Sequence, residues 1–140
     1  MENIRMAVTQ VSRITGEDGE VTELRSQARG CLRDRILTYT ELSEGARVFH
    51  RLDLREEGAV TVTRTGAIVS TLRFEAGKRQ SSVYRIPPYA FDMEHETEAL
   101  SLTCGEAGVL LSLRFRSSIG GASQVTEMTV RATPTGKETP

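Results

Sequence analysis

The chain has 140 residues, a length typical of one domain that buries about 68% of its unfolded surface. Its formal net charge of −1, with 26% charged residues, gives no overall attraction to nucleic acid or to an anionic membrane. No run reaches the ~18 apolar residues of a membrane span. Residues 1–10 lack the basic and apolar regions of a signal peptide, so we expect a cytoplasmic protein.

Apolar and polar residues alternate through most of the chain, which is the period of a half-buried β-strand. The pattern begins with Ile4, Met6 and Val8 on one face. Further runs predict strands at residues 21–33, 36–42, 48–54, 80–86, 91–104, 109–115 and 125–132. Short turns that contain glycine separate the strands at residues 16–19, 43–45, 56–58, 105–108 and 120–121. The run at 24–32 also fits a helical spacing, and Gly30 within it marks a candidate bend or bulge.

The clearest hairpin lies in residues 59–77, where two alternating runs flank Arg64-Thr65-Gly66. We predict a three-residue loop with Gly66 in the left-handed conformation, which the missing Cβ makes accessible. This loop pairs Val62 with Ile68. It places one set of side chains on a common face: Val60, Val62, Ile68, Ser70, Leu72 and Phe74. A two-residue loop would separate Val60 and Val62 from the others, because a slip of one residue turns every side chain to the opposite face.

The second half of the chain carries two irregularities. Pro87 and Pro88 end the strand before them, because neither proline can donate a ladder hydrogen bond. The apolar parity changes between residues 93–97 and 100–104, so a bulge is predicted near residues 98–99. The domain is expected to span residues 1–133, and residues 134–140, which have little to bury, to form a mobile tail.

The predicted fold is all-β, with eight to ten strands spaced about 10 residues apart and joined by short turns. This pattern is typical of an antiparallel sandwich or of an up-and-down β-barrel. A meander of hairpins with few long crossovers favours a single barrel, which also removes the exposed edges of the sheet.

Several short motifs, taken in order and spacing, resemble the YwiB-like family of small bacterial proteins of unknown function. The motifs that carry the resemblance are Arg64-x-Gly66, Arg73-Phe74, Gly77, Tyr84, Pro88-Tyr89, Phe91, Met93, Thr97 and Leu100. The similarity as a whole covers residues 4–132. Ala90 departs from the family, which usually has glycine after Pro-Tyr, so we expect this turn to have a different shape here. The resemblance implies a calycin-like or lipocalin-like barrel in a cytoplasmic protein, and it implies no established activity.

Four residues are candidates for contact with a small ligand inside the barrel. His50 and His95 lie on inward faces of their strands, and the predicted hairpin loop places Arg64 at a barrel mouth. A guanidinium matches a carboxylate in a two-point fork, so Arg64 would bind an anionic group, with Tyr39 as a further polar contact. Small barrels either fill their interior with side chains or hold one small ligand.

Other chemistry is less well supported. Cys31 and Cys104 are expected to be reduced and packed, with a disulfide bridge as the alternative. The two cysteines lie far apart, with no CxxC motif and no histidine nearby in the sequence, so the spacing of a zinc site is missing. No glycine-rich phosphate loop occurs. Cys31, His50 and Asp53 are the one nucleophilic grouping, and Asp53 points away from His50 in a regular strand. We therefore assign no metal, cofactor or catalytic residue and expect that the protein is not an enzyme.

Two charged groups are expected on the outside of the barrel. The acidic stripe, Asp92, Glu94, Glu96 and Glu98, is expected to be solvated and to deter edge pairing. The basic group consists of Arg73, Lys78, Arg79, Arg85, Arg114 and Arg116. Barrels that bind nucleic acid interleave such residues with exposed aromatics, and here Tyr84 and Tyr89 are the candidates. We therefore do not expect nucleic acid as a partner.

The favoured function is a module that binds a small apolar or amphipathic anionic ligand inside the barrel. The alternative is a filled barrel that acts through its outer face as a protein-protein interaction module or a homodimer. A continuous cavity above ~300 Å³ would favour the first function, and a packed interior with an exposed apolar patch would favour the second.

Overall fold

The computed structural model describes residues 3–43 and 45–135, and this part of the chain contains ten β-strands and no helix. The strands are β1 (Ile4–Gly16), β2 (Val21–Arg33), β3 (Ile36–Ser43), β4 (Ala46–Asp53), β5 (Ala59–Gly66), β6 (Ser70–Glu75), β7 (Arg79–Ile86), β8 (Tyr89–Gly105), β9 (Gly108–Ile119) and β10 (Ala122–Pro134). Among the described residues there is accordingly no helix long and apolar enough to cross a membrane.

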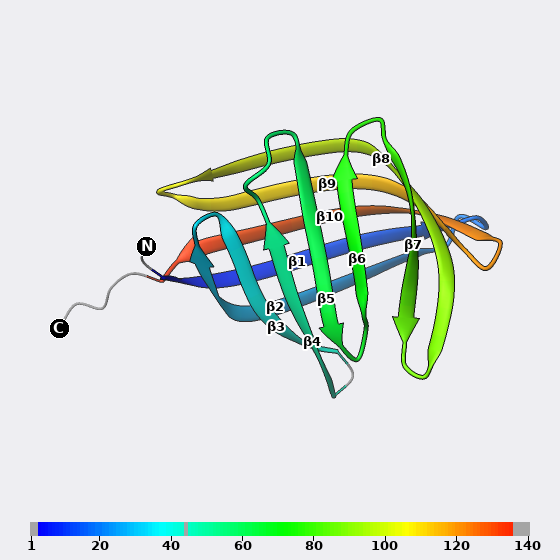
Figure 1. The fold of residues 1–140 in the computed structure, drawn as a ribbon, viewed down its shortest axis with the longest axis horizontal. Helices are drawn as coiled ribbons and strands as arrows, with labels where there is room; N and C mark the ends of the chain where they lie inside the picture. Colours follow the sequence, from blue (N-terminus) through cyan, green and yellow to red (C-terminus); the bar gives the residue numbers. More distant parts are fainter. Residues whose placement is uncertain (1–2, 44, 136–140) are drawn as a thin grey trace.

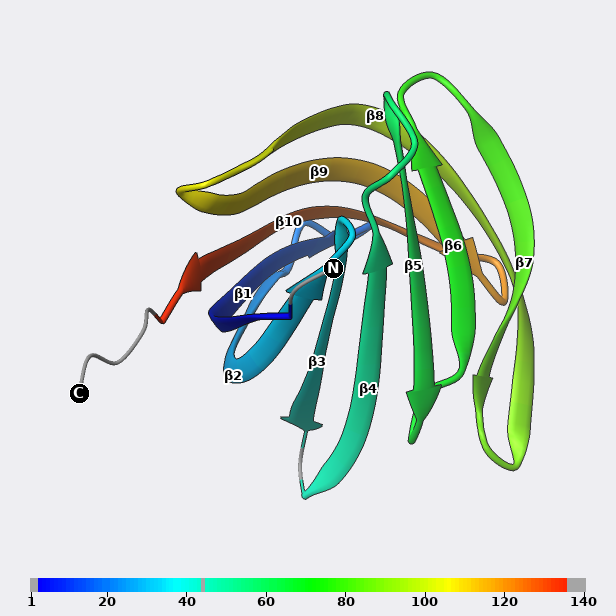
Figure 2. The same ribbon diagram turned by 60° about the vertical axis from the view of Figure 1, so that its left-hand side comes forward.

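The ten strands form one antiparallel sheet in the order β6-β5-β4-β3-β2-β1-β10-β9-β8-β7. Each strand pairs with its neighbours in the chain, except β6 and β7, which are the two edges of the sheet. β1 joins the two halves of the meander by pairing with both β2 and β10. The sheet curls until β6 and β7 meet, which gives a nearly closed barrel (Figures 1 and 2). The predicted all-β, up-and-down barrel is confirmed, and the ambiguous residues 24–32 belong to β2.

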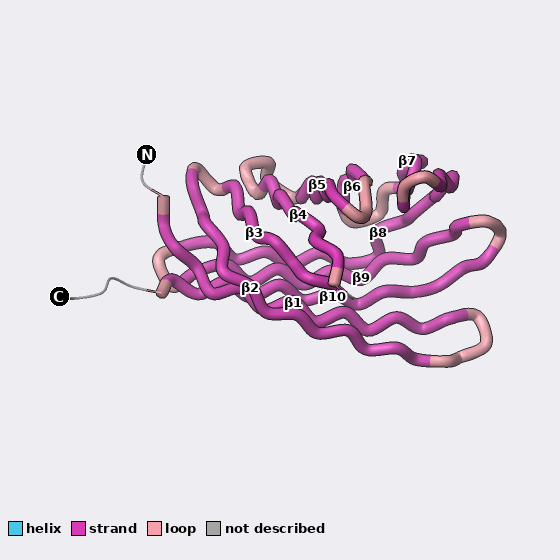
Figure 3. Tube along the Cα trace, turned by 90° about the horizontal axis from the view of Figure 1, so that it is seen from below, coloured by secondary structure: helices cyan, strands magenta, loops and turns pink. Residues whose placement is uncertain are grey.

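The barrel consists of two layers that face each other. The long strands β1, β2, β8, β9 and β10 form one layer, and the shorter β3 to β7 cross them at a steep angle (Figures 1 and 3). β2 pairs with β3 from Gly30 to Arg33, and beyond these residues the two strands diverge. A Cβ on Gly30 would lie 2.5 Å from the Thr38 carbonyl oxygen. Gly30 therefore marks a close approach of two strands at the corner of the barrel, and its pairing with β1 is continuous, without a bulge.

The hairpin of β5 and β6 corrects the predicted loop. Arg64 pairs with Ser70 and Val62 with Leu72, so residues 65–69 form the connection and the three-residue loop is wrong. Gly66 has the expected positive φ, +102°, but it continues β5 along β4, where Ala67 donates a backbone hydrogen bond to the Arg47 carbonyl. The register moves by an even number of residues, so the predicted common face is preserved. Its members in β5 and β6 are buried: Val60, Val62, Ser70, Leu72 and Phe74.

Two further predictions concern β8 and β10. The register of β8 against β9 shifts between Thr97 and Ala99, which confirms the predicted bulge. β10 continues to Pro134, and the amide of Thr135 donates to the Arg5 carbonyl at 3.0 Å. Paired structure thus extends two residues past the predicted domain end. Residues 136–140 of the predicted tail, and Glu44 of the predicted turn at 43–45, lie outside the described residues.

The seam between β6 and β7 is closed by backbone hydrogen bonds at its two ends and by side-chain hydrogen bonds between them. At one end Val69 and Arg85 exchange two backbone hydrogen bonds of 2.9 Å, and at the other the Gly77 amide donates to the Thr97 carbonyl. Between them, the Arg73 amide donates to the Gln80 side chain at 2.8 Å. Side chains thus replace part of the ladder that would close the barrel, and they satisfy backbone groups that are costly to bury unpaired.

The close approach at Gly30 gives a prediction. Gly30→Ala should lower the free energy of unfolding by about 1–3 kcal/mol, because the new methyl group must displace the Thr38 backbone. Gly105→Ala, at a strand glycine with no heavy atom near the Cβ position, should change it by about 0.5 kcal/mol or less. Urea unfolding of both variants measures the difference, and equal effects would contradict the packing account.

Candidate functional site

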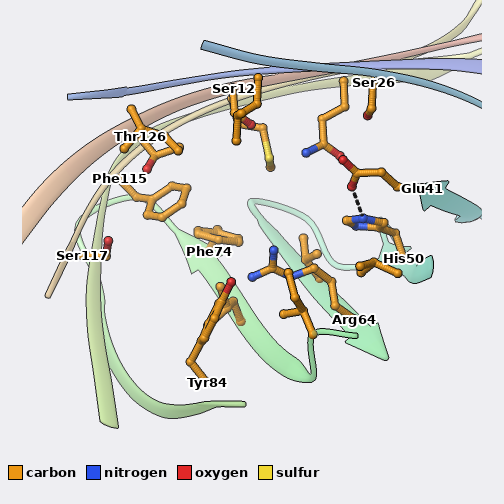
Figure 4. A pocket seen from close by; sticks show the side chains of 18 of the residues that line it. Ser12, Ser26, Glu41, His50, Arg64, Phe74, Tyr84, Phe115, Ser117 and Thr126 are labelled. Carbon is orange, nitrogen blue, oxygen red and sulfur yellow. Dashed lines mark hydrogen bonds and ion pairs between the residues drawn. The ribbon is translucent and has the colours of Figure 1, made fainter. Parts of the chain in front are cut away.

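The inward faces of the strands change character along their length. On β1, Met6 lies in the apolar core, whereas Ser12 lines a cavity. The same change runs from Leu54, which directly follows β4, to His50 within that strand. The result is a barrel with a filled core half and a cavity half, the latter nearer the β1–β2, β5–β6 and β9–β10 turns. The cavity measures about 300 Å³, and Figure 4 shows its walls.

Arg64 projects from β5 into the cavity. Its guanidinium points between Phe74 and Tyr84 in Figure 4, and its central carbon lies 5.3 Å from the centroid of the Tyr84 ring. Its Nε donates to the Ser70 hydroxyl at 3.1 Å. Among the described residues, no carboxylate lies within ion-pairing distance of this guanidinium. Arg64 is therefore a cation held by neutral neighbours.

A second polar group in the cavity is built around His50. The ring of His50 stacks on Tyr39, its cross-strand partner, with centroids 4.7 Å apart and planes 7° from parallel. Its Nε2 lies 2.8 Å from Glu41 Oε1. The hydroxyl of Tyr39 donates to Gln10 Oε1 at 2.6 Å, which connects β3 to β1 across the diverging strands. These contacts orient Glu41 toward the interior.

The electrostatics of this group follow from its neighbours. The hydrogen bond with His50 is the main cause that lowers the pKa of Glu41 below its ordinary value of 4.5; Arg64 and the Ser26 hydroxyl lower it further, against the opposing effect of burial. Burial is the main cause that raises the pKa of Tyr39 well above its ordinary value. At neutral pH the cavity therefore contains an ionised carboxylate and a protonated phenol.

The far wall of the cavity is more apolar. Phe74 and Phe115 pack with ring centroids 4.8 Å apart, and Met93 lies on the same wall. Ser117 stands beside them on β9 with 2% of its surface exposed, and its hydroxyl has no hydrogen-bond partner among the described residues. A buried hydroxyl without a partner is costly, so this wall offers one unused polar contact beside a large apolar surface.

His95 has a different environment from the other three candidates. It is buried behind the cavity wall, against Phe74 and Phe115, and does not line the cavity. Its Nε2 lies 2.8 Å from the Arg73 carbonyl, which can accept but not donate, so Nε2 carries the proton. His95 thus supplies, from β8, the hydrogen bond that β7 would give Arg73 in a closed ladder.

The structure therefore brings together three of the four predicted site residues: Tyr39, His50 and Arg64. Sequence reasoning missed Glu41, the partner of His50, although it follows Leu37 and Tyr39 at the strand period and so shares their inward face. The same signal would have found Gln10 and Ser12 two and four residues beyond Val8. At each of these positions, a polar residue follows a run of alternating apolar residues at the same two-residue spacing, and so lies on the same inward face.

The remaining chemical groupings lie elsewhere. Asp53 pairs with Arg55 at 2.8 Å on the outer surface, and this partner lowers the pKa of Asp53 to about 2. It does not join His50, in agreement with the predicted strand geometry. Cys31 and Cys104 are free thiols, each partly buried. Among the described residues, no three His, Cys, Asp or Glu side chains gather in a way that could hold a metal ion.

The outer charges neutralise one another. Arg114 contacts Glu98 at 2.8 Å and Glu127 at 3.0 Å, and Arg116 also contacts Glu98. Arg79 pairs with Glu96 of the acidic stripe. Arg73 pairs with Glu75 of its own strand, β6, and with Glu56 in the connection between β4 and β5. Four of the six predicted basic residues and two of the four acidic ones therefore take part in ion pairs on the outer wall, which mixes the two signs.

Comparison with known proteins identifies the family. The family described as "Domain of unknown function (DUF1934)" matches residues 6–130, and the chain belongs to it. A solved structure, the ywiB protein from Bacillus subtilis, superposes with a TM-score of 0.77 at 20% sequence identity, covering 96% of this chain and 94% of that one. This likeness shows a shared barrel fold. No curated protein matches the sequence.

The lowered pKa of Glu41 predicts a pH dependence of stability. Because the folded-state value lies below 4.5, the ionised carboxylate stabilises the fold above pH 4.5, and this contribution is lost as the pH falls through the folded-state pKa. The free energy of unfolding of the wild type should therefore exceed that of Glu41→Gln above pH 4.5. The two values should converge in more acidic solution. Urea titrations between about pH 3 and pH 7 measure the difference, and a constant difference would contradict the assignment.

The seam contact of His95 gives a second prediction. His95→Ala should lower the free energy of unfolding by about 2–4 kcal/mol, because it removes a buried ring and leaves the Arg73 carbonyl without its donor. His95→Gln keeps a nitrogen donor and should recover part of the loss. Thermal and urea unfolding of the pair provide the comparison, and identical losses would show that the hydrogen bond contributes nothing.

Proposed function

We propose that the protein binds a small amphipathic anion in the cavity half of its barrel, and that it acts as a binding module and not as an enzyme. The observation that carries this proposal is Arg64, a cation that lines an internal cavity and has no ion-pair partner among the described residues. Arg64 is half-buried, and its guanidinium makes no direct contact with a carboxylate among the described residues. An anionic group at this position would form the two-point contact that a guanidinium offers.

The remaining lining supports an amphipathic ligand. Phe74, Phe115 and Met93 provide an apolar wall on one side of the guanidinium. The ring of Tyr84 covers one face of Arg64, a contact that helps to hold the cation in a fixed position. An anion at Arg64 with an apolar body against the two phenylalanines would use both kinds of surface.

The cavity volume restricts the size of the ligand. About 300 Å³ lies at the lower end of the range for small-molecule pockets and equals the share of about ten waters in liquid. A compact aromatic or short aliphatic acid fits this volume. We therefore place a long-chain lipid outside the expected ligands, although calycin-like barrels with larger interiors could hold one.

Two alternatives are weaker. A filled barrel that acts through its outer face agrees less well with a polar cavity, although exposed Tyr89 and Ile86 on the β7–β8 hairpin offer some apolar surface. A nucleic-acid surface agrees less well with the ion pairs of the outer wall. The proposal retains the expected cytoplasmic location.

The proposal predicts which ligands bind and which residue they need. Naphthylpropionate should bind more tightly than the uncharged naphthylpropionamide, which has the same shape without the negative charge. Arg64→Gln should weaken naphthylpropionate about 10- to 100-fold, the effect of losing a charged hydrogen bond, and should change binding of the amide little. Isothermal titration calorimetry measures all four affinities.

Arg25→Gln is the matched control, because it removes the same charge from an exposed arginine at the cavity rim. Its effect on naphthylpropionate should be about two-fold or less, since solvent and salt screen an exposed charge. Equal affinity of carboxylate and amide for the wild type, or equal losses in Arg64→Gln and Arg25→Gln, would contradict a specific anion site.

A further inference from the structure

The charged side chains of the cavity are unequally placed. Arg25 lies at the rim, pairs with Glu23 and has 67% of its side chain exposed. Glu41 and Arg64 face the interior, and each has its own hydrogen-bond partner: His50 for Glu41, Ser70 for Arg64. They line the same cavity, yet they are not within ion-pairing distance of each other. The cavity therefore has a negative pole at Glu41 and a positive pole at Arg64.

A ligand with one negative charge is only partly suited to this arrangement. Before binding, the charges of Arg64 and Glu41 sum to zero. An anion at Arg64 adds a second negative charge close to the carboxylate of Glu41, and like charges in a partly desolvated cavity repel each other. A ligand that also carries a positive group would remove this repulsion.

We propose that the ligand is a zwitterion with an apolar body, such as an amino acid with a large apolar side chain: its anionic group meets Arg64 and its ammonium group meets Glu41. This inference rests on the proposed anion site and names the class of molecule that the site takes. A carboxylate offers about four lone-pair positions, and His50 uses one on Oε1. Glu41 therefore keeps capacity to accept from an ammonium group.

His50 suggests the competing account. In that account, the hydrogen bond between His50 and Glu41 satisfies the carboxylate well enough that it tolerates a bound anion nearby. That account requires no ammonium group on the ligand, and it predicts that a simple carboxylate binds at least as tightly as the corresponding amino acid. The two accounts therefore differ in one measurable preference.

The test compares naphthylalanine with naphthylpropionate, which differ by the ammonium group. At neutral pH the wild type should bind naphthylalanine at least about 10-fold more tightly, a difference typical of one charged contact. Glu41→Gln keeps the shape of the side chain and removes its charge, so it should abolish this preference and strengthen naphthylpropionate binding. Glu23→Gln, which removes an exposed carboxylate near the rim, should leave the preference unchanged. Calorimetric titrations measure the affinities.

The outcomes separate this inference from the proposed function. If naphthylpropionate binds the wild type as tightly as naphthylalanine, and Arg64→Gln still weakens it, the zwitterion inference is wrong and the anion site stands. If the preference survives in Glu41→Gln, the ammonium group is recognised elsewhere, and the assignment to Glu41 is overturned. If neither compound binds the wild type, both proposals fail.

Discussion

A barrel of ten strands encloses more volume than this chain can fill with its side chains. Interior width grows with strand number, and about eight strands already leave just enough room for packed side chains. The chain has no tryptophan and 5% aromatic residues. Its aliphatic residues fill one half of the interior, around Leu37, Leu54 and Leu111. The other half is left to polar side chains and a cavity, and this division underlies everything that we propose about function.

The same geometry explains why polar side chains carry structural tasks. Where the layers turn, neighbouring strands separate, and their backbone and side-chain groups need other partners. Gln80 and His95 serve Arg73 at the seam between β6 and β7. Tyr39 and Gln10 connect β3 to β1 where β2 and β3 diverge. His95 thus stabilises the seam of the barrel, whereas His50 orients a carboxylate toward the cavity.

Much of this architecture is readable from the alternation of residues, and the failures have physical causes. The faces of β5 and β6 are predicted correctly, because a register shift by an even number of residues leaves every side chain on the same face. The loop is predicted wrongly, because Gly66 and the residue after it contact Arg47 of β4, and rules for local turns do not include contacts with a third strand. Arg64 and His50 stand out by residue type. Glu41 did not, because an acidic residue in a strand usually faces water, and its inward direction depends on the orientation that Tyr39 and His50 impose.

The central claim is that the cavity holds a ligand through Arg64. Native mass spectrometry of gently purified protein, with the wild type and Arg64→Gln prepared side by side, tests it without assuming which ligand the cell supplies. The account predicts a small molecule of fixed mass on the wild type, released on denaturation, and a clearly lower occupancy on the variant. A wild-type barrel that carries nothing, or the same mass at equal occupancy on both proteins, would contradict it.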